Sequence, residues 1–306
     1  MFKYLKRRLL MLIPLLLVVS IIVFSMIHLM PGDPAMIIAG EGASQADIEA
    51  VKHKHGLDKP LFVQYFTWLG NIIRGDFGKS LRTGRPISQE IGFRFVNTIK
   101  LATLAIVIGS ILGLVMGIVS ATKRYSFFDN VTMVIAMVGV SITPFYLGLM
   151  SILLFSVKLG WLPMMGVESW KGWILPATTL AFRPAAMIAR MTRSNMLEIL
   201  GQDYILSARA LGLPNKVVFV KYALRNALNT VVTVIGLQLG LLMGGAVMTE
   251  TVFSLPGIGR LAVESIKGRD FPSIQVSVLL IALSFVIINL AVDILYAIIN
   301  PRISYN

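Results

Sequence analysis

The chain has 306 residues, of which 56% are hydrophobic and 14% are charged, and it carries a formal net charge of +13. A soluble domain needs a more polar surface than this composition provides, so we expect a surface that faces lipid. The cations lie between long apolar segments and do not form one basic face, which argues against nucleic-acid binding and for membrane topology. The absence of cysteine excludes disulfides, thiolate zinc sites and iron–sulfur clusters.

Six stretches are long and apolar enough to cross a bilayer as α-helices, which takes about 20 residues each. The first follows a basic N-terminus, but it is too long for a cleaved signal peptide and no small-residue cleavage site follows it, so we expect a retained signal anchor. The fourth contains Arg183 and Pro184, which we expect to interrupt it. The predicted fold is an all-α integral membrane protein with six transmembrane helices at residues 9–30, 98–121, 131–157, 174–191, 227–249 and 274–299.

The charges between these stretches predict the orientation of the chain. With a cytoplasmic N-terminus, the inner segments hold far more cations than acids, whereas the long outer loop 31–96 is nearly neutral. Because segments rich in Lys and Arg remain in the cytoplasm, both termini are predicted to be cytoplasmic. The inner cations are Lys3, Lys6, Arg7, Arg8, Lys123, Arg124, Arg190, Arg193, Arg209, Lys216, Lys221, Arg225 and Arg302, and the inner acids are Asp129, Glu198 and Asp203.

Two short helices are predicted in the extracytoplasmic loop 31–96. Ser44 and Asp47 have the spacing of a capping box, and Gly56 suits the end of the helix that follows. Pro60 suits the start of a second helix. The apolar stripe of that second helix consists of Leu61, Tyr65, Leu69 and Ile72.

The chain shows no motif for catalysis, nucleotide binding or metal binding. The Gly-Lys-Ser sequence at 78–80 resembles part of a phosphate-binding loop, but Ile73 stands where the Walker motif requires glycine. On a helix, His53 and His55 would point about 200° apart, which suits a solvated face better than a metal site. We therefore predict that this chain alone is not an enzyme.

Three ionisable residues within or at the ends of predicted spans are candidate pore or gate residues: Arg183, Glu250 and Asp293. A charge in hydrocarbon costs at least about 2.5 kcal/mol unless it is paired or faces water. Arg183 is a candidate contact for an anionic solute group, with a structural ion pair or snorkelling as the alternative for Arg183 and Asp293. Glu250 is a candidate gate or an interfacial residue.

Two glycine ladders in the second and fifth spans place glycines four residues apart on one helix face. Glycine allows close helix packing, which is the simpler interpretation, and lining of a pore is the alternative. The ladders consist of Gly109, Gly113, Gly117, Gly236, Gly240 and Gly244.

The predicted cytoplasmic loop 192–226 is too polar to enter lipid, yet it is rich in helix-forming residues and short apolar anchors. A helix is predicted from Asp203, closed by Gly212, with Pro214 just beyond the point where the helix must end. A second helix is predicted at about 216–224. The side chains that suit a groove on a partner protein are Phe219, Lys221, Tyr222 and Arg225.

The sequence D-Y-I-L-S-A-R-A-L-G at 203–212 resembles the EAA motif of ABC importer permeases, in the form common in the dipeptide, oligopeptide and nickel branch. Placing the glycine of that motif on Gly212 brings Ala208 and Leu224 into register. The departures from the general pattern are Leu206, Ser207, Tyr222 and Arg225. Other stretches that resemble this branch are P-G-D-P at 31–34, G-L-D-K-P-L at 56–61, G-D-F-G at 75–78 with Ser80, E-T-V-F-S at 250–254, P-G-I-G at 256–259, R-D-F-P at 269–272 and N-P-R at 300–302.

The resemblance implies a pore-forming permease that imports dipeptides, oligopeptides or glutathione-like peptides across a bacterial or archaeal cytoplasmic membrane. It implies a second homologous permease, two ABC ATPase subunits that hold ATP and Mg²⁺, and an extracytoplasmic solute-binding protein, with no cofactor on this chain itself. The implied domains are 1–97, with the first span and the outer loop, and 98–306, the permease domain. The implied ATPase-coupling residues are Asp203, Ala208, Arg209, Ala210, Gly212, Leu224 and Arg225.

Two alternatives remain open. Within the same branch, the cargo could be nickel or an opine-type metal chelate, because the predicted spans contain no feature that decides the solute. In a different class, the chain could be a membrane receptor or scaffold that never transports, which would explain the spans but not the loop 192–226.

Overall fold

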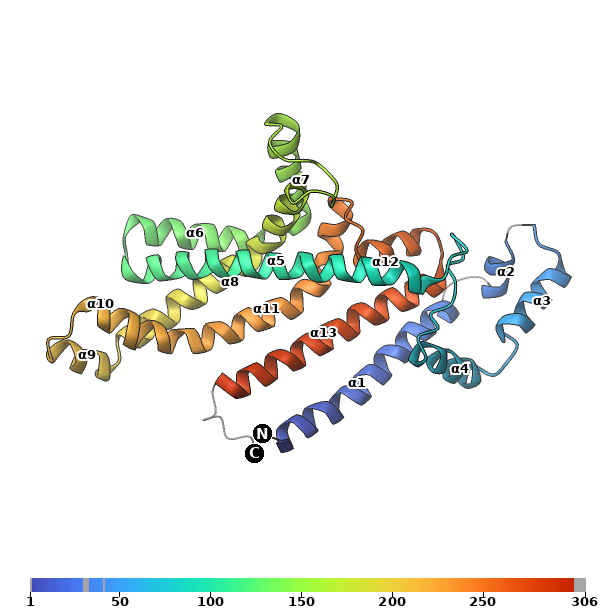
Figure 1. Cartoon of the computed structure of the whole chain (residues 1–306), viewed down its shortest axis with the longest axis horizontal. Helices are drawn as coiled ribbons and strands as arrows, with labels where there is room; N and C mark the ends of the chain where they lie inside the picture. The colour runs from blue at the N-terminus through green and yellow to red at the C-terminus, as the bar shows by residue number, and fades with distance from the viewer. Residues whose placement is uncertain (1, 30–32, 41, 300–306) are drawn as a thin grey trace. The chain divides into compact units, whose positions relative to one another are not determined.

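The computed structural model describes residues 2–29, 33–40 and 42–299, and within them the chain is built of helices, with one isolated β-bridge between Lys79 and Pro86 (Figure 1). The all-α prediction is confirmed. The motif residues Pro31 and Gly32 and those at 300–302 lie outside the described residues. The chain divides into two compact units, one formed by residues 98–255 and 285–299 and the other by residues 2–97 and 256–284.

The unit formed by residues 2–97 and 256–284 holds both helices predicted for the loop 31–96. Ser44 Oγ accepts a hydrogen bond from the Asp47 N–H and the Asp47 carboxylate accepts one from the Ser44 N–H, so the capping box is confirmed. Gly56 ends that helix with φ 65°, as predicted. The helices of this unit are α1 (Phe2–Leu29), α2 (Pro34–Ala39), α3 (Gln45–His55), α4 (Leu61–Ile73), the start of α5 (Ile87–Thr122), α12 (Ile258–Lys267) and the start of α13 (Phe271–Ile299).

The short helix α2 was not predicted. Asp33 caps it by accepting a hydrogen bond from the Ala35 N–H and forms a 2.6 Å ion pair with Lys52 of α3. The Lys52 ammonium holds the pKa of Asp33 below its usual value. The P-G-D-P motif thus continues into a helix that is tied to α3.

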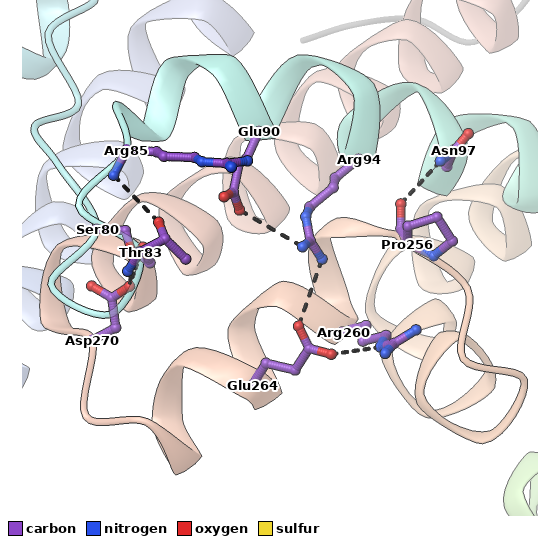
Figure 2. Close-up of polar contacts among 11 residues, drawn as sticks. Ser80, Thr83, Arg85, Glu90, Arg94, Asn97, Pro256, Arg260, Glu264 and Asp270 are labelled. Atoms are coloured by element: carbon purple, nitrogen blue, oxygen red, sulfur yellow. Dashed lines mark hydrogen bonds and ion pairs between the residues drawn. The ribbon is translucent and has the colours of Figure 1, made fainter.

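Polar contacts join the start of α5, α12 and the loop before α5 (Figure 2). Arg94 lies 3.7 Å from Glu90 and 3.8 Å from Glu264, which also pairs with Arg260 at 2.7 Å. In the same unit, the buried Asp270 carboxylate accepts hydrogen bonds from the Ser80 hydroxyl and from the Leu81 N–H. An apolar core of Ile87, Ile91, Ile258, Leu261 and Val276 completes this packing.

The other unit is a bundle in which α8 (Lys171–Leu200) is the central helix. Figure 1 shows α5, α6, α8 and α11 running along one another, and buried residues recur along almost the whole of α8. The remaining elements are α6 (Phe127–Ser141), α7 (Pro144–Ser151), the π-helical turn η1 (Ile152–Lys158), α9 (Asp203–Ala210), α10 (Asn215–Val217), the π-helical turn η2 (Val218–Leu224), α11 (Arg225–Val252) and the end of α13.

The first glycine ladder packs α5 directly onto α8. A Cβ atom built on Gly113 would lie 2.7 Å from the Ala185 carbonyl oxygen and from Ile188 Cβ, and Gly109 and Gly117 meet α8 in the same way one turn to either side. In the second ladder, Gly236 and Gly240 face Val292 and Asn289 of α13, whereas Gly244 has no atom within 4 Å. Close helix packing is therefore the role of five of the six glycines.

The structure confirms four of the predicted spans as helices of sufficient length and apolarity: Leu10–His28, Ile87–Thr122, Asn215–Val252 and Phe271–Ile294. The predicted span 131–157 is broken, because α6 and the α7–η1 helix meet at an angle of 107°. Ile142 is extended before Thr143, which caps α7, and Pro144 favours such a break by disfavouring helix in the residues before it.

The expected interruption of the fourth span at Arg183 and Pro184 is wrong, since α8 continues through both residues to Leu200. Pro184 is buried and packs against Gly109, and the helix continues through it although proline lacks a backbone N–H. Helix α8 is not apolar enough to qualify as a span on composition alone. The count of six spans stays a prediction.

Candidate functional site

The helix predicted from Asp203 is present as α9, in the connection between α8 and α11 (Figure 1). Gln202 is extended before the helix, Asp203 lies in its first turn and Arg209 in its last. This placement of the acid and the cation is favourable for the helix dipole. Residues 192–200, which were predicted to belong to the loop, continue α8 instead.

One face of α9 is anchored inside the bundle. Ile205 is fully buried and Ala208 is 5% exposed, and both belong to an apolar cluster with Met196 of α8 and with Val218 and Ala223 of η2. This set is called the anchor cluster below. Because the anchor cluster draws on both flanking segments, α9 is packed against α8 and η2 at once.

Gly212 makes the turn that ends α9. Its φ of +74° lies in the left-handed region that favours glycine. The Gly212 N–H donates to the Arg209 carbonyl at 3.0 Å, and the Leu213 N–H donates to the Ala208 carbonyl at 3.3 Å. Pro214 lies just beyond this turn, as the sequence predicted, and is the N-cap residue of α10.

The opposite face of α9 is open. Leu206 and Leu211 are 54% and 81% exposed, and Arg209, Ala210 and Gly212 are exposed beside them. We call these five residues the α9 tip. An exposed apolar patch with a cation at its edge is typical of a protein–protein contact surface.

The second predicted partner surface is only partly available. Phe219, Tyr222 and Leu224 pack on the anchor cluster, so these side chains serve the interior of the bundle. Lys221 and Arg225 are exposed. The Asn226 amide donates to the Tyr204 hydroxyl at 3.1 Å and thereby joins α9 to the start of α11.

The three candidate pore or gate residues lie on three different helices. Arg183 is exposed on α8, and Asp293 is half-buried on α13. Glu250, on α11, is 1% exposed and accepts a hydrogen bond from the Thr98 hydroxyl of α5 at 2.5 Å. Glu250 is therefore enclosed by its own bundle in this conformation.

An ion pair between α6 and α8 was not predicted. Asp129, at the start of α6, is 1% exposed and forms a two-pronged contact with Arg193 of α8, at 2.6 and 2.7 Å. The Asp129 carboxylate also accepts hydrogen bonds from the Ser120 hydroxyl and from the Tyr125 N–H. This pair joins the end of α5, the start of α6 and the last third of α8.

The comparisons with known proteins agree on one family. The family model described as "Binding-protein-dependent transport system inner membrane component" matches residues 109–305, and the model of its N-terminal part matches residues 1–103. The glutathione transport system permease protein GsiC of Escherichia coli K12 is 46% identical over 305 residues, covering 100% of both chains, and GsiC of Salmonella choleraesuis is equally similar.

Among solved structures, an inward-facing MetNI methionine ABC transporter matches with a TM-score of 0.60 and 21% identity, covering 70% of this chain and 98% of the other. An amino acid ABC transporter matches with a TM-score of 0.54 and 18% identity, covering 71% and 95%. These two matches support the fold. On the family models and the full-length relatives, the chain belongs to the inner membrane components of binding-protein-dependent transport systems, and it is a multi-pass ABC importer permease and not an enzyme.

Proposed function

We propose that this chain forms half of the pore of an importer for small peptides and that glutathione is among its solutes. The observation that carries the proposal is the 46% identity to a glutathione permease over the full length of both chains. In this proposal the other half of the pore is a second, homologous permease. An extracytoplasmic binding protein supplies the solute, and two ABC ATPases hold ATP and Mg²⁺.

In the proposed orientation, both termini and α9 face the cytoplasm. The α9 tip, with Leu206, Arg209 and Leu211, docks on an ATPase subunit. Closure of the ATPases on ATP then displaces α9, and the anchor cluster passes this movement to α8 and to η2. The other predicted coupling residues lie in α9 or close to it along the chain, and they are Asp203, Ala208, Ala210, Gly212, Leu224 and Arg225.

The alternatives are less well supported. A nickel or metal-chelate permease would belong to the same branch, but the full-length relatives reported above are named for glutathione. A receptor or scaffold that never transports would not need a helix that is anchored on one face and open on the other. The loop between α8 and α11 therefore favours transport.

Uptake into proteoliposomes that contain the complete complex tests the proposal. We expect ATP-dependent accumulation of radiolabelled glutathione when the binding protein is present, and no accumulation of ⁶³Ni²⁺. A complex without this chain is the control and should accumulate neither solute. Accumulation of ⁶³Ni²⁺ without glutathione would overturn the peptide proposal in favour of the metal alternative.

A further inference from the structure

Helix α8 leaves one face uncovered, and that face carries two arginines. Arg183, Arg190 and Ser194 are exposed and Met187 is half-buried between them. Their spacings of four, seven and eleven residues from Arg183 place them on one side of an α-helix. We call these four residues the arginine face.

Most of the rest of α8 is enclosed by its own bundle, although Lys171, Thr178 and Glu198 are exposed. On the α5 side, Gly109, Gly113 and Gly117 approach its backbone closely, and on the α6 side Gly139 meets Ala186 and Phe182. The arginine face also ends abruptly toward the start of α8. One turn before Arg183 on the same face, Thr179 is 4% exposed, and Pro176 is buried as well. The open part of the face therefore begins at Arg183 and runs toward α9.

Most N–H donors of the Arg183 and Arg190 guanidinium groups make no hydrogen bond within the described residues. Within the described residues, no hydrogen bond or ion pair is found for Arg183, and Arg190 Nη2 contacts the Met187 sulfur at 3.4 Å. Each guanidinium presents five N–H donors in a fork that matches a carboxylate. The arginine face thus carries unused capacity for binding an anion.

Lipid tails are an unsuitable environment for this face, because an unpaired arginine in the middle of a span is costly in hydrocarbon. Water or a solute is the suitable environment.

The spacing of the two arginines matches a short peptide. Seven residues of helix separate the two arginines by about 10 Å along the axis. An extended tripeptide also spans about 10 Å, which brings carboxylates near its two ends to the same spacing.

We propose that the arginine face of α8 lines the solute path and that Arg183 and Arg190 bind the carboxylates of anionic peptides as they pass. The inference rests on the proposed function and deepens it: the favoured solutes are small peptides with more than one carboxylate. Arg183, at the closed end of the open face, is the first of the two to meet the solute.

Cysteine labelling tests whether water reaches the arginine face. The chain contains no cysteine, so single variants can be read without a background. In the assembled complex, we expect Met187→Cys and Ser194→Cys to react with a membrane-impermeant methanethiosulfonate reagent supplied from the α9 side. Val134→Cys is the matched control, because Val134 is 58% exposed on α6 in an apolar surface that we expect to face lipid. Labelling of Met187→Cys and Ser194→Cys no faster than Val134→Cys would overturn the proposal.

Uptake of radiolabelled glutathione by the complete complex tests whether the positive charge of Arg183 binds the solute. Arg183→Gln should lower kcat/KM by about tenfold to a hundredfold, the range for one charge-assisted hydrogen-bonded contact. Arg183→Lys should recover part of the loss because it retains the charge. Arg124→Gln, an exposed arginine at the turn between α5 and α6, is the control and should match the wild type.

The outcomes separate the two proposals. If the wild type and Arg124→Gln take up glutathione and Arg183→Gln does so equally well, the role of the arginine face is wrong and peptide import stands. If the wild type takes up no glutathione in the presence of its binding protein, glutathione import is wrong and the inference falls with it.

Discussion

At the scale of single residues, Gly212 is subject to two separate constraints. One is the left-handed backbone of the turn, and the other is the proposed contact with the ATPase. The φ of +74° at Gly212 disfavours most residues with a Cβ atom, at a cost of about 1–2 kcal/mol. Apart from Gly212 and its two chain neighbours, no residue of the described chain has an atom within 4 Å of where that Cβ would be. A large side chain would therefore find space within this chain and would project where we propose that the ATPase docks.

Gly212→Trp should abolish uptake and leave membrane insertion intact, because the obstruction lies outside the bundle. Gly212→Asn is the matched control, since asparagine tolerates the left-handed conformation and is small. Uptake by the complete complex, together with the amount of chain in the membrane fraction, measures both effects. Normal uptake by Gly212→Trp would show that the end of α9 is not a close contact of the complex.

The ion pair between Asp129 and Arg193 gives a second prediction at this scale. Arg193→Gln leaves a carboxylate that is 1% exposed without its cation, which should destabilise the bundle by about 3–5 kcal/mol. Adding Asp129→Asn should restore part of the stability, because the uncompensated buried charge is then removed. The melting temperature of the purified complex measures both changes. Equal melting temperatures for Arg193→Gln and the wild type would contradict a stabilising role for this pair.

At the scale of elements, close packing of α5 on α8 gives the bundle a testable contact. Gly113→Ala would place a methyl group 2.7 Å from the Ala185 carbonyl oxygen, and relief of this overlap should cost about 1–3 kcal/mol. Gly244→Ala is the control, because Gly244 has no atom within 4 Å and alanine favours a helix interior. The free energy of unfolding in detergent should fall for Gly113→Ala only, and a similar fall for both variants would contradict the packing.

The sequence predicted best those elements whose signals are local. The capping box of α3, the end of α3 at Gly56 and the end of α9 at Gly212 each depend on residues within a few positions of one another. The bend between α6 and α7 lies at Pro144, a local signal that the long apolar run 131–157 concealed.

The features that escaped prediction depend on residues far apart in the chain. Asp129 and Arg193 are 64 residues apart, and neither position alone indicates an ion pair. The arginine face of α8 is defined by what covers the rest of the helix, namely the packing of α5, α6 and α11 against it. For the same reason, sequence reasoning singled out Arg183 but could not show that Arg190 shares its exposed face.

At the scale of the whole molecule, helix α8 connects two tasks. Its last turns supply Met196 to the anchor cluster under α9, and its middle carries the arginine face. In our account, movement of α9 on ATP binding reaches the solute path through this one helix. The α9 tip is the proposed contact with the ATPase on which this movement depends.

Cross-linking tests that claim most directly, because a chain without cysteine allows one thiol to be placed at will. Leu211→Cys, at a position that is 81% exposed on the α9 tip, should form an adduct with an ATPase subunit in the assembled complex when a short thiol-to-amine cross-linker is added. Trp170→Cys, at a position that is 72% exposed just before α8, is the control and should form none. An ATPase adduct from Trp170→Cys with none from Leu211→Cys would contradict both the proposed orientation and the role of α9.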